Sequence, residues 1–128
     1  MNKMALASNR VAKPFGIFSQ AIKAGTLIFV SGQVAKDASA EVVGKGDIKA
    51  QTKQCLENLK HVLEAGGATL GDVVKLTVYV ANMEHLSMIH EVRAEYFKEP
   101  YPASTLIEVS RFTHPEYLIE IEAVAITS

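Results

Sequence analysis

Hydrophobic and polar residues alternate over residues 118–126, and this pattern predicts a β-strand. Ile119 and Ile121 fall on one face of such a strand, whereas Glu120 and Glu122 fall on the other. Carboxylates are uncommon in strands and are almost never buried alone. The acidic face must therefore contact water, a cation, a ligand or another subunit, and a solvent-exposed sheet face is the simplest alternative.

Similar patterns predict three more strands and two helices. Residues 26–31, 73–81 and 103–110 are rich in apolar residues and predict strands. Apolar residues recur at helical spacing from the N-cap Asp47 to the glycines at 66 and 67, and again over residues 84–98. The residues expected to face the core are Ile48, Thr52, Cys55, Leu59, Val62 and Leu63 in the first helix, Leu86, Ile89, Val92, Tyr96 and Phe97 in the second, and Val74, Leu76, Val78 and Val80 in the strand between them.

The order of these elements predicts an α+β fold, in a single domain that spans residues 1–128. Both helices would cover one face of a mixed, mainly antiparallel sheet. The opposite face of the sheet would mix apolar, aromatic and acidic side chains, and the residues expected on it are Lys75, Thr77, Tyr79, Leu106, Glu108, Glu120 and Glu122. Such a mixed face suits a subunit interface that contains a ligand cleft, and an ordinary solvent-exposed face is the alternative.

The composition limits the functional classes. The formal net charge of −1 gives no electrostatic attraction to nucleic acid or anionic lipid. No apolar run approaches the roughly 20 residues that span a bilayer, and no signal-peptide pattern precedes Pro14. Cys55 is the single cysteine, which excludes an internal disulfide and suits the cytoplasm. One cysteine and four scattered histidines give no metal-ligand spacing, so we expect neither a metal nor a cofactor.

Seven short motifs follow one another along nearly the whole chain. They are Phe15-Gly-Ile-Phe-Ser-Gln-Ala21, Phe29-Val-Ser-Gly-Gln33, Gln51-Thr52 with Asn58-Leu59, residues 66–75, Glu95-Tyr-Phe97, Pro102-Ala103 and residues 119–125. Together they resemble the RidA (YjgF, L-PSP) family. The resemblance implies a chorismate-mutase-like fold and a homotrimer with a central barrel and clefts between subunits. It also implies hydrolysis of reactive enamines and imines to a keto acid and ammonia.

The resemblance assigns roles to several residues. Glu120 matches the family's acid near the attacking water, so it would act as general base or would orient that water. The alternative is an interface carboxylate paired with Lys75 or Arg111. Ser31 and Gly32 match a segment beside the substrate, and an ordinary turn at a strand end is the alternative there.

Four expected substrate-site positions depart from the family's pattern. Where the family has Pro-Ala-Arg-Ser, this chain has Ser104, which cannot supply the guanidinium that binds a substrate carboxylate. Leu106 stands where the family has a Cys, and Phe18 stands where it has a Tyr. His90 stands where the family has an Asn. This histidine could transfer protons in the site, and the alternative is an ordinary surface position without a functional role.

Because Ser104 lacks the charge, hydrolysis of small imino acids such as 2-aminoacrylate is expected to be weak or absent. Arg93 or Arg111 could replace the missing cation, and a solvated role is the alternative for each. Three functions stay open: a deaminase-type hydrolase of enamines and imines, a non-catalytic trimer that binds a small metabolite or a regulatory partner, and an endoribonuclease. The near-neutral charge disfavours the endoribonuclease.

Overall fold

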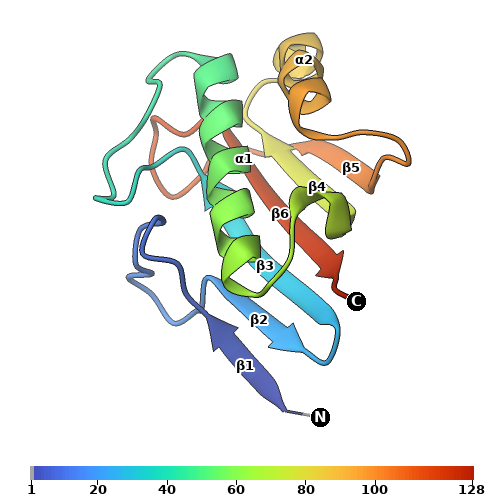
Figure 1. Ribbon diagram of the computed structural model, residues 1–128. Helices are drawn as coiled ribbons and strands as arrows, with labels where there is room; N and C mark the ends of the chain where they lie inside the picture. Colours follow the sequence, from blue (N-terminus) through green and yellow to red (C-terminus); the bar gives the residue numbers. More distant parts are fainter. Residues whose placement is uncertain (1) are drawn as a thin grey trace.

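The computed structural model describes residues 2–128, and Met1, the first residue of the predicted domain, lies outside the described residues. Within them, six strands form one sheet, and two α-helices pack on one face of it (Figure 1). The predicted α+β fold with two helices on one face of a mixed sheet is therefore confirmed. The elements are β1 (Lys3–Leu6), β2 (Ala21–Ala24), β3 (Leu27–Val34), α1 (Ile48–Ala65), β4 (Val73–Val80), α2 (Leu86–Tyr96), β5 (Ala103–Glu108) and β6 (Ile119–Ile126), with short 3₁₀ turns at Leu70–Asp72 and Met83–His85.

The strand order in the sheet is β1-β2-β3-β6-β4-β5. The chain's last strand, β6, lies between β3 and β4 and pairs antiparallel with both. β5 runs parallel to β4, because α2 crosses over between these two strands. β6 is therefore central to the sheet, and β5 is an edge strand that lies beside α2 (Figure 1).

α1 covers the centre of the sheet with an apolar stripe, as predicted. Asp47 caps the helix, because its Oδ1 accepts a hydrogen bond from the backbone N of Ala50 at 3.1 Å. Cys55, Leu59 and Val62 are completely buried, and burial raises the pKa of the Cys55 thiol, which favours a core role for it. Neither α1 nor α2 combines the length and the apolarity that a bilayer-crossing helix needs.

The mixed face of the sheet turns away from the helices. Tyr79 pairs with Glu120 and Thr77 with Glu122, so these four side chains share that face. The prediction that Leu106 and Glu108 also lie there is wrong: they pair with Val78 and Val80, whose side chains are buried beneath the helices. The register of a parallel pair is set by tertiary structure, and the sequence alone does not give it.

Two predicted core positions are wrong. Val74 is 42% exposed, because a β-bulge between Val73 and Lys75 turns Val73 toward the core instead. Leu86 is 36% exposed, because it is the first residue of α2 and lies beside a pocket. The sequence also gave no sign of β1 and β2, which are only four residues each.

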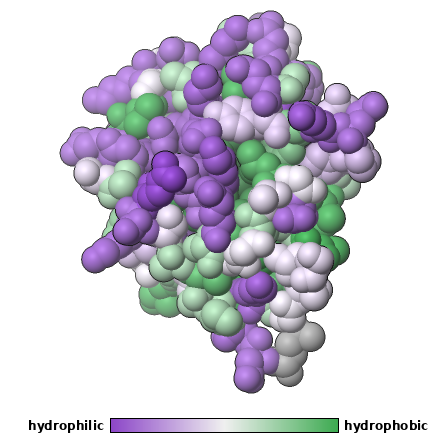
Figure 2. Space-filling model, in the orientation of Figure 1, coloured by the Kyte–Doolittle hydropathy of each residue, from purple (hydrophilic) through white to green (hydrophobic). Residues whose placement is uncertain are grey.

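The side that carries the helices is largely hydrophilic on its outer surface, and apolar side chains show between the polar ones (Figure 2). Several large apolar side chains are nevertheless exposed beside β2, in the segment that leads to it. Phe15, Ile17 and Phe18 are 83%, 108% and 54% exposed. Three such residues within four positions form an apolar surface that a monomer rarely presents to water.

Candidate functional site

The seven predicted site residues line two separate pockets of the chain. The first, which we call the acid pocket, has a volume of about 380 Å³ and lies between the segment before β2, β3 and the start of β6. The second, the guanidinium pocket, has a volume of about 490 Å³ and lies between α2 and β5. The acid pocket contains Phe18, Ser31, Gly32 and Glu120, and the guanidinium pocket contains His90, Ser104 and Leu106.

A glycine beside Glu120 shapes the acid pocket. The register of β3 against β6 shifts between Val30 and Gln33, so the backbone at Ser31 and Gly32 leaves the regular ladder. The carboxylate of Glu120 lies directly over Gly32, where a Cβ atom would overlap Glu120 Oε2. A residue with a side chain at position 32 would therefore displace the carboxylate.

The environment of Glu120 disfavours its charged form. Burial raises the pKa of the Glu120 carboxyl, and the negative charge of Glu122 raises it further. No hydrogen bond or ion pair from residues 2–128 holds this carboxylate; Lys75, one of the two expected partners, donates instead to Thr105 Oγ1 at 2.6 Å. A desolvated carboxylate without a partner is suited to accept a proton from a water or a ligand.

Glu122 has different surroundings, although it lies on the same face of β6. The Tyr79 hydroxyl donates a short hydrogen bond to Glu122 Oε1. This bond and the neighbouring charges, together with burial, raise the pKa of Tyr79, so the phenol keeps its proton. Of the two acids, Glu120 is therefore the one that is free to react.

The hydroxyl of Ser31 is already engaged within the chain. Its Oγ donates to the backbone oxygen of Ser19 at 2.6 Å, so its hydroxyl proton is not free for a ligand, and the oxygen can serve only as an acceptor. Sequence reasoning missed Lys36, whose ammonium lines the same pocket and lies 4.7 Å from the centre of the Phe15 ring. Burial lowers the pKa of Lys36. In the sequence, only the position of Lys36 just after β3 could have indicated a role, because its spacing from other polar residues matches no known type of site.

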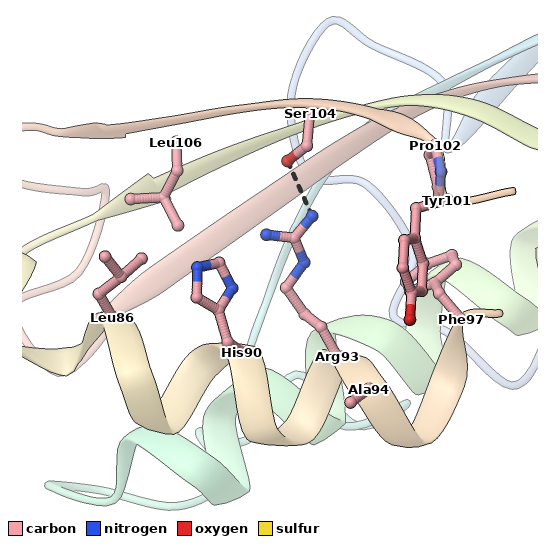
Figure 3. A pocket seen from close by; sticks show the side chains of 9 residues that line it. All are labelled: Leu86, His90, Arg93, Ala94, Phe97, Tyr101, Pro102, Ser104 and Leu106. Atoms are coloured by element: carbon pink, nitrogen blue, oxygen red, sulfur yellow. Dashed lines mark hydrogen bonds between the residues drawn. The ribbon is translucent and has the colours of Figure 1, made fainter. Parts of the chain in front are cut away.

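α2 and β5 form the two walls of the guanidinium pocket (Figure 3). His90 and Arg93, which are one helical turn apart, project from α2 toward β5. Arg93 Nη2 donates a hydrogen bond to Ser104 Oγ at 2.7 Å. Burial lowers the pKa of Arg93. The other residues that line this pocket are Leu86, Ala94, Phe97, Tyr101, Pro102 and Leu106.

Arg111, the other candidate cation, is exposed in the segment before β6 and lines neither pocket. Among residues 2–128, no three His, Cys, Asp or Glu side chains gather in a metal-binding arrangement. Among the polar side chains that line the two pockets are thus those of Glu120 and Lys36 in the acid pocket and of Arg93 and His90 in the guanidinium pocket.

The fold and the pockets define a small α+β protein with an acidic pocket and a cationic pocket on different elements of one chain. Residues 8–127 match the model of a family described as Endoribonuclease L-PSP. The chain therefore belongs to the L-PSP family, also called the RidA or YjgF family, as its motifs predict.

Individual relatives match over almost the whole chain. A RutC family protein of Pyrococcus horikoshii is 48% identical over 123 residues, which cover 96% of this chain and 97% of the relative. A 2-iminobutanoate/2-iminopropanoate deaminase of Salmonella typhimurium is 32% identical over 124 residues, which cover 94% and 95% of the two chains. The crystal structure of a putative endoribonuclease from Thermotoga maritima, 38% identical, superimposes with a TM-score of 0.92 over 98% of each chain.

Proposed function

We propose that this protein is a deaminase-type hydrolase, which adds water to the C=N bond of small imines and of the imine tautomers of enamines. The observation that carries the proposal is the desolvated Glu120 carboxylate, which lies over Gly32 in an open pocket and has no partner within the described chain. The deaminase of Salmonella typhimurium, 32% identical, supports this reaction class.

Glu120 takes part in both halves of the reaction. A water oxygen forms a bond to the imine carbon while Glu120 accepts the water proton, and the C=N π electrons move to nitrogen. Glu120 returns this proton to the nitrogen, which gives the neutral carbinolamine. In the collapse, Glu120 accepts the remaining hydroxyl proton while the oxygen's electrons form C=O and the C–N bond breaks, and it passes this second proton to the leaving nitrogen. An imine and one water thus give a carbonyl compound and ammonia, and Glu120 ends in its starting state.

We further propose that the complete site lies between subunits of a homotrimer. Within one chain, the acid pocket lies at the middle strands β3 and β6, whereas the guanidinium pocket lies at the edge strand β5. The exposed Phe15, Ile17 and Phe18 adjoin the acid pocket and suit contact with a second copy. The guanidinium pocket of one subunit would then close the acid pocket of its neighbour.

The assay that tests the function follows ammonia release from 2-iminobutanoate, which an amino-acid oxidase generates in place from 2-aminobutanoate. The wild-type protein should accelerate the formation of 2-oxobutanoate and ammonia over the uncatalysed reaction. Glu120→Gln keeps the size of the side chain but removes the base, so the rate should fall by roughly 10²- to 10⁴-fold. Glu122→Gln, on the same strand face, is the matched control and should keep most of the activity.

Binding of 2-oxobutanoate without any turnover would favour a non-catalytic metabolite-binding trimer instead. We do not propose the endoribonuclease activity, because a net charge of −1 provides no attraction to the RNA backbone. A cytoplasmic location remains part of the proposal, since the buried Cys55 is the chain's single cysteine.

A further inference from the structure

The guanidinium of Arg93 is half-buried and has a neutral partner. Ser104 Oγ accepts a hydrogen bond from one of the five N–H groups of the Arg93 guanidinium. Within residues 2–128, no carboxylate lies within 4.0 Å of this guanidinium. A desolvated cation normally has an acidic partner, because removing a charge from water is costly unless it is paired. Arg93 therefore has four donors available for an anion that the chain itself does not supply.

The acidic residues nearest to Arg93 on α2 point elsewhere. Glu91 forms an ion pair with Lys49 of α1. Glu95 lines another pocket, together with Lys60 and Thr69. The guanidinium pocket itself has no acidic lining residue, and its walls are mostly apolar. In such surroundings, a guanidinium attracts an anion more strongly than it would in water.

Ser104 fixes where the guanidinium lies. Its side chain is short, so the head of Arg93 reaches across from α2 to the strand β5 (Figure 3). A planar guanidinium held in this way presents parallel N–H groups, which match the two oxygens of a carboxylate. Arg93 is thus a cation carried by a helix, and it lies beside the strand position at which the sequence has no charge.

We propose that Arg93 binds the carboxylate of the ligand in the guanidinium pocket and that Ser104 is the residue that positions it. Within the proposed function, this pocket then selects ligands that carry a carboxylate over neutral imines, through a cation that the helix α2 supplies. The identity of the reaction rests on the proposed function, but the recognition of the carboxylate does not. Hydrolysis of small imino acids should accordingly be efficient, in contrast to the expectation drawn from Ser104 alone.

Calorimetric titration tests the recognition without turnover. The wild-type protein should bind 2-oxobutanoate, and the neutral 2-oxobutanamide should bind roughly 10- to 150-fold more weakly, as expected for loss of a charged hydrogen-bonding group. Arg93→Met should weaken the binding of 2-oxobutanoate by a similar factor and leave that of the amide unchanged. Arg111→Met removes the same charge from an exposed position and should bind both ligands like the wild type.

Several outcomes would overturn the proposal. These are a wild type that does not bind 2-oxobutanoate, a wild type that binds acid and amide equally, or an Arg93→Met variant with unchanged affinity. A loss of affinity in Arg111→Met but not in Arg93→Met would transfer the role to Arg111. Circular dichroism and the thermal midpoint of each variant establish that the fold is retained.

A charge-swap experiment provides a second, kinetic test. Ser104→Arg places two guanidinium groups together and should raise KM for 2-iminobutanoate, whereas the double variant Arg93→Ser/Ser104→Arg should lower it again. Independent effects of the two substitutions would contradict a shared site. If the wild type and Glu120→Gln both bind 2-oxobutanoate through Arg93 but neither releases ammonia, the proposed function fails and the carboxylate site stands.

Discussion

Gly32 is the residue that allows Glu120 to lie where it does. Its backbone does not require glycine's conformational freedom, since no positive φ is found there, but a Cβ atom would overlap the Glu120 carboxylate. Gly32→Ala should therefore lower kcat for imine hydrolysis by about 10²-fold, because a displacement of about 1 Å at a reacting group has such an effect.

The matched control for this substitution is Gly71→Ala. The added Cβ at position 71 would meet only Thr69 Oγ1, at an ordinary contact distance of 3.5 Å. The kcat of Gly71→Ala for imine hydrolysis should therefore equal that of the wild type. Equal activities for Gly32→Ala and Gly71→Ala would show that the position of the Glu120 carboxylate is unimportant for the reaction.

The raised pKa of Glu120 predicts the pH dependence of activity. Because the base must be ionised, kcat/KM should rise with pH through an inflection above the ordinary glutamate pKa of about 4.3. Burial is the larger cause of the shift and Glu122 the smaller. Glu122→Gln should therefore move the inflection toward lower pH without restoring the ordinary value, and an unmoved inflection would exclude coupling between the two acids.

The same pKa shift affects stability, with the opposite sign to that of a paired carboxylate. The folded state disfavours ionised Glu120, so this cost is absent below the ordinary pKa and complete above the raised one. Glu120→Gln removes this unfavourable contribution to the folded state. The free energy of unfolding of the variant, relative to that of the wild type, should therefore increase as pH rises from the ordinary to the raised pKa of Glu120, and urea unfolding at several pH values measures it.

The sequence was sufficient to nominate some of the residues that line the two pockets and not others. Strand alternation places both Glu120 and Glu122 on a polar face, and only the family resemblance singles out Glu120; Gly32 likewise belongs to one of the matching motifs. The bond between Arg93 and Ser104 joins a helix to the strand that follows it, 11 residues later. Only tertiary packing decides which turn of the helix faces which strand residue, so the sequence left Arg93 and Arg111 as equal alternatives.

At the scale of the elements, periodicity was most informative where an element is regular. The buried stripe of α1 and the alternation of β6 follow the sequence pattern directly. The pattern was misleading where the backbone is irregular, as at the bulge that exposes Val74, and where pairing is parallel, as at Leu106. β1 and β2 escaped prediction because four residues contain too little periodicity to distinguish a strand from a loop.

One buried polar residue connects α1 to the segment that leads into β6. The Gln51 side chain is completely buried; its Nε2 donates to the Glu116 oxygen at 2.8 Å, and its Oε1 accepts from the Leu118 N at 2.8 Å. Gln51→Ala would leave these backbone groups unpaired. The free energy of unfolding should fall by about 1–3 kcal/mol in urea titrations.

Lys53→Ala provides the control for this effect. Lys53 lies on the same helix, is exposed, and makes no side-chain hydrogen bond or ion pair within residues 2–128. Its removal should change the free energy of unfolding by less than about 0.5 kcal/mol. Both variants are compared at one protein concentration, because the stability of an oligomer depends on it. Equal losses would mean that the hydrogen bonds of Gln51 do not hold the β6 segment.

At the scale of the whole molecule, the chain presents two partial sites and surfaces suited to join them. The acid pocket is flanked by exposed aromatic and aliphatic side chains, and the guanidinium pocket lies at the edge strand β5. Sedimentation should therefore give a species of three times the chain mass of 13.9 kDa at micromolar concentration. A monomer under these conditions would leave each pocket incomplete and would contradict the shared site.

A crystal structure of the protein soaked with 2-oxobutanoate tests the central claim most directly, because it locates both ends of the ligand. The ligand carboxylate should lie about 2.7–2.9 Å from the guanidinium of Arg93 in one subunit. The carbonyl carbon of the same ligand should face Glu120 of the adjacent subunit. A ligand that binds without contact to Arg93, or whose carbonyl carbon lies far from any Glu120, would contradict the account.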